Sequence, residues 1–267
     1  MSLKSKILVE RPAFLPEFDS WQSIYEKRIA ITGASGTLGR ILCSRLEKRG
    51  IGYSAFEGDI TEPDQVNAWI IDSNPEIFFH FAAMVPVHDV LANPSRAMKT
   101  NALSMLQVMD SLKELAQGCW LFYASSSHVY QDTQRDGTAQ AINEDSPTGP
   151  KSLYGATKLA GESICRPLAD CYQIPLCVGR IFSFFHDSQP DPYLIPSLYR
   201  RIREAADEST LEIQNTEAIR DFLNAEMVVD AILWLSAIRA EGIINIASGS
   251  GISVGEIAKK IARNEGK

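Results

Sequence analysis

The chain has 267 residues and a formal net charge of −7, with 45% apolar and 22% charged residues. This composition is typical of a globular protein with a substantial core, and the negative charge argues against a broad nucleic-acid-binding surface. No apolar run approaches the roughly 20 residues that a membrane helix needs. We therefore expect neither nucleic acid nor a membrane as a partner.

The cysteines argue against a structural disulfide framework and against a zinc site. There are five of them, an odd number, and none forms a C-x-x-C pair, so we expect no metal. The N-terminal segment contains no sustained apolar core and does not resemble a secretory signal. These features predict a cytoplasmic protein whose thiols are reduced.

Regular patterns begin only after residue 27, so we expect residues 1–27 to form a peripheral N-terminal arm. Short, continuously apolar segments then alternate with segments of helical spacing, and strands of this kind are typical of a sheet covered on both faces. We expect strands at 28–32, 52–56, 76–82, 119–125 and 176–181, and helices at 37–49, 62–72, 95–115 and 152–172. The alternation predicts an α/β fold, a doubly wound parallel sheet of the Rossmann type, in residues 28–182.

The regular alternation of predicted strands and helices is less clear after residue 182, where several prolines interrupt it. We expect helices at 193–206 and 225–238, strands at 211–214 and 242–246, and a last helix opened by a capping box at Ser253 and Glu256. Residues 183–267 are therefore expected to form a smaller C-terminal substrate-binding lobe that also returns elements to the main sheet.

A glycine-rich turn follows the first predicted strand, with glycine at every third position of residues 33–39. Such a turn exposes backbone N–H groups beside the positive end of a helix, which suits the phosphates of a dinucleotide. The choice between NAD and NADP stays open. Glu57 and Asp59 are the acidic residues near the end of the second strand, and Arg40 faces either a 2′-phosphate or solvent.

Tyr154 and Lys158 lie four residues apart near the start of a predicted helix and share one face. A nearby ammonium and a positive nicotinamide ring favour the phenolate of a tyrosine, whose ordinary pKa is about 10. We therefore expect Tyr154 to exchange a proton with a sugar hydroxyl or ketone. The preceding strand ends in serines at 125–127, and ligands of parallel sheets bind at such carboxyl ends, where a hydroxyl can hold the substrate oxygen.

Taken in order, these motifs resemble the extended short-chain dehydrogenase/reductase family, in its branch of nucleotide-sugar epimerases, dehydratases and reductases. Residues 32–39 are similar to the family's TGxxGxxG, residues 80–83 to its HxAA, residues 220–224 to its RDFIHV and residues 245–249 to its NIGSG. The resemblance runs from about residue 28 to residue 263.

The resemblance implies the site residues. The catalytic set is Asn101, Ser126, Tyr154 and Lys158. NAD or NADP is the implied cofactor, held by Gly33, Ser35, Gly36, Thr37, Leu38, Gly39, Asp59, Ile60, Phe81, Ala82, Ala83 and Lys158. A nucleotide-sugar is the implied substrate, contacted by His128, Ser183 and Arg220, with the arginine at the diphosphate. Members commonly dimerise through two helices, here those at 95–115 and 152–172, so we expect a homodimer.

The chain departs from the family pattern at the substrate end. Dehydratases of this branch carry Asp-Glu after the catalytic serine, whereas Ser127 and His128 stand here, which disfavours water loss. His128 either shuttles a proton or only hydrogen-bonds the sugar. Ser183 stands where an asparagine is usual and His186 replaces a glycine, so the sugar contacts are expected to differ.

The sequence therefore predicts an NAD(P)-dependent oxidoreductase or epimerase that acts on a sugar carbon of a nucleotide-sugar, namely a 4-keto-sugar reductase or epimerase. A catalytically silent NAD(P)-binding sensor or scaffold is one alternative, and the complete catalytic set argues against it. A reductase of a non-nucleotide substrate is another. Arg220, with further arginines at positions 180, 200 and 201, argues against that second alternative.

Overall fold

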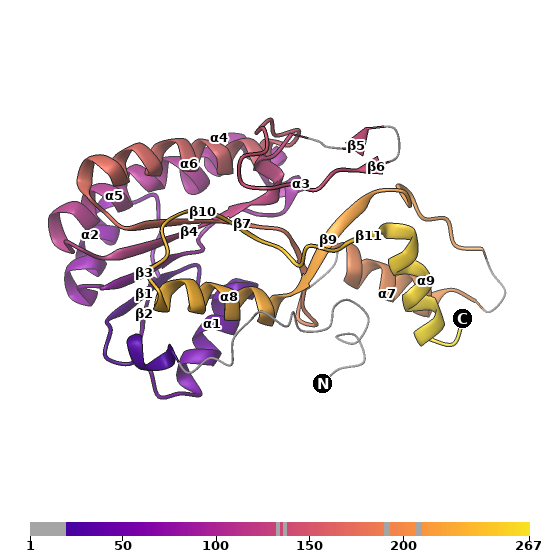
Figure 1. Ribbon diagram of the computed structural model, residues 1–267, viewed down its shortest axis with the longest axis horizontal. Helices are drawn as coiled ribbons and strands as arrows, with labels where there is room; N and C mark the ends of the chain where they lie inside the picture. Colours follow the sequence, from indigo (N-terminus) through magenta and orange to yellow (C-terminus); the bar gives the residue numbers. More distant parts are fainter. Residues whose placement is uncertain (1–19, 132–133, 136–137, 190–192, 207–209) are drawn as a thin grey trace.

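A six-stranded sheet forms the centre of the protein (Figure 1). The structure is a computed structural model that describes residues 20–131, 134–135, 138–189, 193–206 and 210–267. The strands all pair in parallel, in the order β10-β7-β4-β3-β1-β2. They are β1 Ile29–Thr32, β2 Ser54–Ala55, β3 Ile77–His80, β4 Trp120–Ser126, β7 Leu176–Ile181 and β10 Gly242–Ile246. The predicted doubly wound parallel sheet is confirmed.

Helices cover both faces of this sheet because its strands are apolar on both sides. Successive residues of β4 alternate between two core clusters, with Trp120 and Phe122 in one and Leu121 and Tyr123 in the other. The first face is covered by α1 (Thr37–Glu47) and α8 (Ala225–Ala237), and the second by α2 (Pro63–Ser73), α5 (Ser104–Leu115) and α6 (Leu153–Tyr172) (Figure 1). Burial on both faces accounts for the continuous apolar runs in the sequence.

A second, smaller sheet lies at the right of Figure 1, beyond the carboxyl end of β7. Its strands, in the order β11-β9-β8, are Gly251–Ser253, Ile219–Asn224 and Ser183–Phe185. Two helices, α7 (Leu194–Glu204) and α9 (Val254–Asn264), share a core with these strands that includes Leu198, Phe222 and Ile257. The predicted capping box at Ser253 and Glu256 is present at the start of α9.

The structure differs from the predicted secondary structure in two places and contains short elements that were not predicted. The helix predicted at 95–115 is interrupted by a π-helical turn, so it comprises α4 (Pro94–Met98), η3 (Lys99–Leu103) and α5. The strand predicted at 211–214 is wrong: Leu211 and Ile213 pack on the small core, but these residues pair with no strand. The additional elements are η2 Ser20–Ser23, α3 Val87–Ala92, η4 Ser127–Val129, β5 Gln134–Arg135 and β6 Thr138–Ala139.

Most of the predicted N-terminal arm, residues 1–19, lies outside the described residues. Just after η2, Ile24 is buried in the core cluster of α1 and α8, and Tyr25 Oη donates to the Arg49 carbonyl at 2.6 Å. Within the described ranges, no helix is long and apolar enough to cross a membrane. The same residues contain no group of three or more His, Cys, Asp or Glu placed to hold a metal ion.

Candidate active site

The glycine-rich turn brings β1, α1 and the end of β3 into close contact. Gly33 has a left-handed φ of +70°, and a Cβ added there would lie 2.7 Å from the Ala82 nitrogen. A Cβ on Gly39 would overlap the Gly33 carbonyl oxygen, so both positions require glycine. Phe81 N donates to the Thr32 carbonyl at 3.1 Å. The residues after β3 that were predicted to line the cofactor therefore lie beside the turn.

The amino end of α1 is suited to binding an anion. Gly36 is the N-cap residue, and no side chain caps the first turn of the helix. Ser35 and Gly36 are exposed and Thr37 is half-buried, whereas Leu38 packs into the core. The positive end of the helix dipole and its first N–H groups thus open at the carboxyl edge of the sheet. This geometry fits the pyrophosphate of a dinucleotide.

Asp59 lies at the start of the turn before α2, where its carboxylate has several partners. Oδ1 accepts hydrogen bonds from the Thr61 nitrogen at 3.0 Å and from its hydroxyl at 2.8 Å. Oδ2 forms an ion pair of 2.6 Å with Arg96 of α4. These bonds, the Thr61 N–H first, lower the pKa of Asp59 to about 2. The carboxylate thus shapes this turn and places Ile60 in the core, and no sequence pattern indicated Arg96 as its partner.

Tyr154 lies in the first turn of α6, next to the end of β4. The ring of His128 lies edge-on to the tyrosine at 5.7 Å between centroids, and Ser126, the last residue of β4, lies near enough to the phenol to affect its pKa. Burial raises the pKa of Tyr154 to about 12, and Ser126 only partly offsets this. Desolvation, which the prediction from helix spacing omitted, thus opposes the lowering expected from the positive charges of Lys158 and of a nicotinamide ring.

Lys158, one helical turn after Tyr154, is also buried. Its ammonium donates to the Ala124 carbonyl at 2.8 Å and lies 5.1 Å from the centre of the Tyr123 ring. Burial lowers the pKa of Lys158 to about 8, and the carboxylate of Glu162 acts in the opposite direction. The cation is therefore held under the end of β4, on the helix face that carries the tyrosine.

Asn101 lies in the π-helical turn and is fully buried. Its amide accepts from the Met84 nitrogen at 2.7 Å and donates to the Met84 carbonyl at 2.9 Å. The same amide donates to the hydroxyl of Thr157 on α6 at 2.9 Å. Asn101 thus ties the loop after β3 to the helix that carries Tyr154, and π-turns of this kind are frequent at functional sites.

The predicted substrate residues come from three separate elements. His128 is in η4, Arg220 is on β9 and Ser183 is on β8, which pairs with β9 in parallel. Burial lowers the pKa of His128, and the positive charge of Arg220 lowers it further. The arginine is exposed, and its Nη1 donates to the Ile219 carbonyl at 2.9 Å. The fold thus brings Arg220 within electrostatic reach of His128, whose ring lies next to Tyr154.

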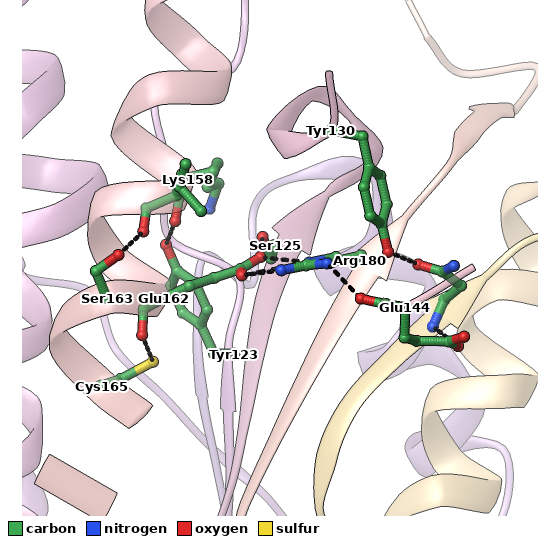
Figure 2. Close-up of polar contacts among 11 residues, drawn as sticks. Tyr123, Ser125, Tyr130, Glu144, Lys158, Glu162, Ser163, Cys165 and Arg180 are labelled. Atoms are coloured by element: carbon green, nitrogen blue, oxygen red, sulfur yellow. Dashed lines mark hydrogen bonds and ion pairs between the residues drawn. The ribbon is translucent and has the colours of Figure 1, made fainter. Parts of the chain in front are cut away.

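Arg180 does not join Arg220 as a cation open to a ligand; it is a buried, structural arginine. Its side chain is 4% exposed and forms an ion pair of 2.7 Å with Glu162 (Figure 2). The guanidinium also lies 4.7 Å from the centre of the Tyr130 ring and donates to the Glu144 carbonyl at 3.3 Å. β7 is an inner strand, so a cation on it needs a buried partner. Glu162, four residues after Lys158, is a site residue that this spacing could have indicated.

The two other arginines lie on α7 in the small lobe. Arg200 pairs with Glu204 at 3.2 Å, and Arg201 donates to the Glu212 carbonyl at 2.5 Å. A cleft of about 530 Å³ opens between α7 and residues 212–214, with Arg201 on its wall. These arginines therefore belong to the outer surface of the lobe and not to the surroundings of Tyr154.

Comparison with known proteins identifies the family. Residues 29–247 match the model of the NAD dependent epimerase/dehydratase family. The chain belongs to this family. It is 27% identical over 245 residues to GDP-6-deoxy-D-mannose reductase from Pseudomonas aeruginosa, covering 88% of this chain and 79% of that protein.

Solved structures agree with this assignment. RMD from Pseudomonas aeruginosa, complexed with NADPH, matches with a TM-score of 0.77 and 26% identity over 87% of this chain and 80% of that one. UDP-glucose 4-epimerase from Thermus thermophilus, in complex with NAD, matches with a TM-score of 0.77 and 21% identity over 90% of this chain and 83% of that one.

The cofactor is NAD or NADP, and the residues present fit it. The uncapped amino end of α1 matches the pyrophosphate, and Phe81 and Ala82 place backbone beside the glycine turn. Glu57, just after β2, and Arg40, in the first turns of α1, are both exposed. These two side chains offer an acceptor for a ribose hydroxyl and a cation for a 2′-phosphate, so either nucleotide fits.

Proposed function

We propose that this chain is an NAD(P)-dependent oxidoreductase of nucleotide-sugars that reduces a 4-keto-sugar, with Asn101, Ser126, Tyr154 and Lys158 as its catalytic set. The observation that carries the proposal is the placement of Tyr154 next to Ser126 at the carboxyl end of β4, with the Lys158 ammonium one helical turn further on and bonded to the Ala124 carbonyl. Ligands of open α/β sheets bind at this edge. The similarity to GDP-6-deoxy-D-mannose reductase supports the substrate class.

The state of Tyr154 favours reduction. With a pKa raised to about 12, the phenol is protonated near neutral pH and is ready to donate a proton to the oxygen of a ketone. Ser126 holds that oxygen, and the Lys158 ammonium stabilises the phenolate that the proton transfer leaves. The reduced nicotinamide supplies the hydride. Oxidation of a sugar hydroxyl would instead begin from the phenolate, which burial disfavours in the ligand-free protein.

The positions of Arg220, His128 and Ser183 support the remaining proposed contacts with the substrate. Arg220 is an exposed cation near His128, suited to a diphosphate through charge-assisted hydrogen bonds. His128, with a lowered pKa, is neutral near pH 7 and hydrogen-bonds the sugar as donor or acceptor. We propose that residues 28–182 bind the cofactor and that residues 183–267, including Ser183, bind the substrate.

The test begins with the cofactor. The purified protein is assayed for bound nicotinamide nucleotide, and NADPH or NADH oxidation is then followed at 340 nm with 4-keto-sugars carried on GDP, dTDP or UDP. Stoichiometric oxidation with one of these carriers, abolished in Tyr154→Phe, is the expected result. Tightly held NAD with interconversion of two sugars and no net oxidation would assign an epimerase. Binding of the cofactor without turnover would assign the sensor or scaffold alternative.

We further propose a homodimer formed through α5 and α6. The support is apolar exposure along the helix that contains η3 and α5, where Leu103 is 47% and Leu106 43% exposed. Light scattering after size exclusion tests this, and Leu106→Glu should shift the mass to that of one chain.

A cytoplasmic location is also proposed, supported by free thiols at all five cysteines, four of them buried. Cell fractionation tests the location.

A further inference from the structure

A buried carboxylate lies behind the catalytic side chains and takes no part in the proposed chemistry. Glu162 is on α6, one turn beyond Lys158, and its side chain is 2% exposed. It accepts a short hydrogen bond from the Ser125 hydroxyl, and it accepts from Arg180 Nη2 at 2.7 Å and Nε at 3.1 Å. Figure 2 shows Glu162 reaching from α6 toward Arg180 on β7, with Ser125 beside them.

The charge state of each titratable group around Lys158 follows from its burial, for every element that packs on this side chain. The titratable groups that face it are Tyr154, Glu162 and Cys165 of α6, Tyr123 of β4 and His80 of β3. Burial lowers the pKa of His80 to about 3 and raises that of Cys165 to about 12, so both are neutral near pH 7. The phenols of Tyr123 and Tyr154 are kept neutral in the same way. Among these groups Glu162 is the anion.

We propose that Glu162 is a positioning residue whose carboxylate is the counter-charge of the Lys158 ammonium and whose bond to Ser125 fixes the end of β4 next to Ser126. Arg180 holds this carboxylate in place from the neighbouring strand. A buried amine without an opposite charge gives up its proton, and a neutral amine no longer stabilises the phenolate of the tyrosine. The catalytic meaning of this inference rests on the proposed function.

The test follows the 13Cε resonance of Lys158 against pH in cofactor-free protein labelled with 13C-lysine, and Lys158→Met identifies the resonance. In Glu162→Gln we expect the titration midpoint to fall by about one pH unit, since a nearby opposite charge moves a pKa by about 1–3 units. Ser163→Ala is the matched control: this serine is exposed and is the next residue of the same helix, so its loss should leave the midpoint unchanged.

Glu162→Gln leaves Arg180 buried without its partner, which threatens the fold. The double variant Glu162→Gln/Arg180→Met leaves neither charge buried without a partner, and its midpoint is also expected to fall, because the carboxylate that raises the pKa of Lys158 is gone. Glu162→Asp keeps the charge and should keep the midpoint near that of the wild type.

A wild-type midpoint in the folded double variant would overturn the proposal, as would a fall in Glu162→Asp as large as in Glu162→Gln. The resonance needs neither substrate nor turnover. An unchanged midpoint therefore leaves the proposed reductase standing, and a failure of the wild type to oxidise NADPH leaves the midpoint result standing.

Discussion

The sequence groups Arg180 with Arg220 as cations near the predicted site, and both lie on strands of the structure, yet their surroundings are opposite. Arg180 is on an inner strand of the large sheet, 4% exposed and paired with Glu162. Arg220 is on β9 of the small sheet, exposed, with its guanidinium on the carbonyl of Ile219. Arg180 is therefore a buried, structural cation, whereas Arg220 is exposed and can contact a ligand.

This contrast between the two arginines separates the buried groups at the large sheet from the exposed cation of the small sheet. The large sheet surrounds its charges with protein, which shifts the pKa values of Tyr154 and Lys158 and fixes their geometry. The small sheet leaves the side chain of Arg220 exposed to solvent, where we propose that it binds the diphosphate of the substrate. We therefore expect substitutions in the large sheet to change turnover or stability, and those in the small lobe to change affinity.

The largest effect is expected for Tyr154→Phe. Loss of the proton donor should lower kcat by about 100- to 10,000-fold. The dissociation constant for NADPH, measured by fluorescence, should stay close to that of the wild type because the glycine turn is untouched. Tyr172→Phe is the matched control, since this tyrosine ends the same helix and bonds Asp110 at 2.8 Å. Equal kcat values for both variants would remove Tyr154 from the chemistry.

Arg180→Met should lower the free energy of unfolding by about 3–5 kcal/mol, because it leaves the Glu162 carboxylate buried without its partner. Urea denaturation measures the change. Adding Glu162→Gln to this variant should recover most of the loss, since the unpaired charge is then gone. If Arg180→Met costs no more than a substitution of the exposed Arg220, the contrast between the two arginines has no energetic basis.

The sequence was most informative where local pattern and tertiary context agree. β10 has the predicted bounds, Gly242–Ile246, and α6, predicted at 152–172, spans Leu153–Tyr172, because apolar runs and helical spacing are local signals. The π-turn around Asn101 was not predictable, since it depends on contacts with Met84 and Thr157 from other elements.

The candidate site divides in the same way. Gly33 and Gly39 could be predicted because backbone geometry requires glycine there. The buried partner of Arg180 could not, because a side chain's exposure depends on which strands and helices surround it. The desolvation that raises the pKa of Tyr154 could not be predicted for the same reason, as spacing along a helix shows the charge of Lys158 and not the degree of burial.

The buried state of Lys158 predicts a pH dependence of stability. Its pKa is about 8 in the folded protein against an ordinary 10.5. Between these values the unfolded chain holds a proton that the folded protein has lost, so stability rises with pH in this window. Relative to Lys158→Met, the wild type should gain roughly 3 kcal/mol at most from pH 7 to 10.5, from about 1.36 kcal/mol per unit. Urea unfolding at several pH values measures this gain, and parallel curves would show that the ammonium is not buried.

Arg220→Gln is expected to have the smallest effect on stability and to change mainly the KM for the substrate. The free energy of unfolding should change by less than about 0.5 kcal/mol, as for other exposed side chains. KM for the nucleotide-sugar should rise about tenfold, the loss of roughly one charge-assisted hydrogen bond to a phosphate, while kcat stays near that of the wild type. The wild-type KM should also rise with salt, and that of the variant should rise less. A variant with unchanged KM but reduced stability would place Arg220 with Arg180 as part of the fold, and the diphosphate would then have to be bound by another part of the small lobe.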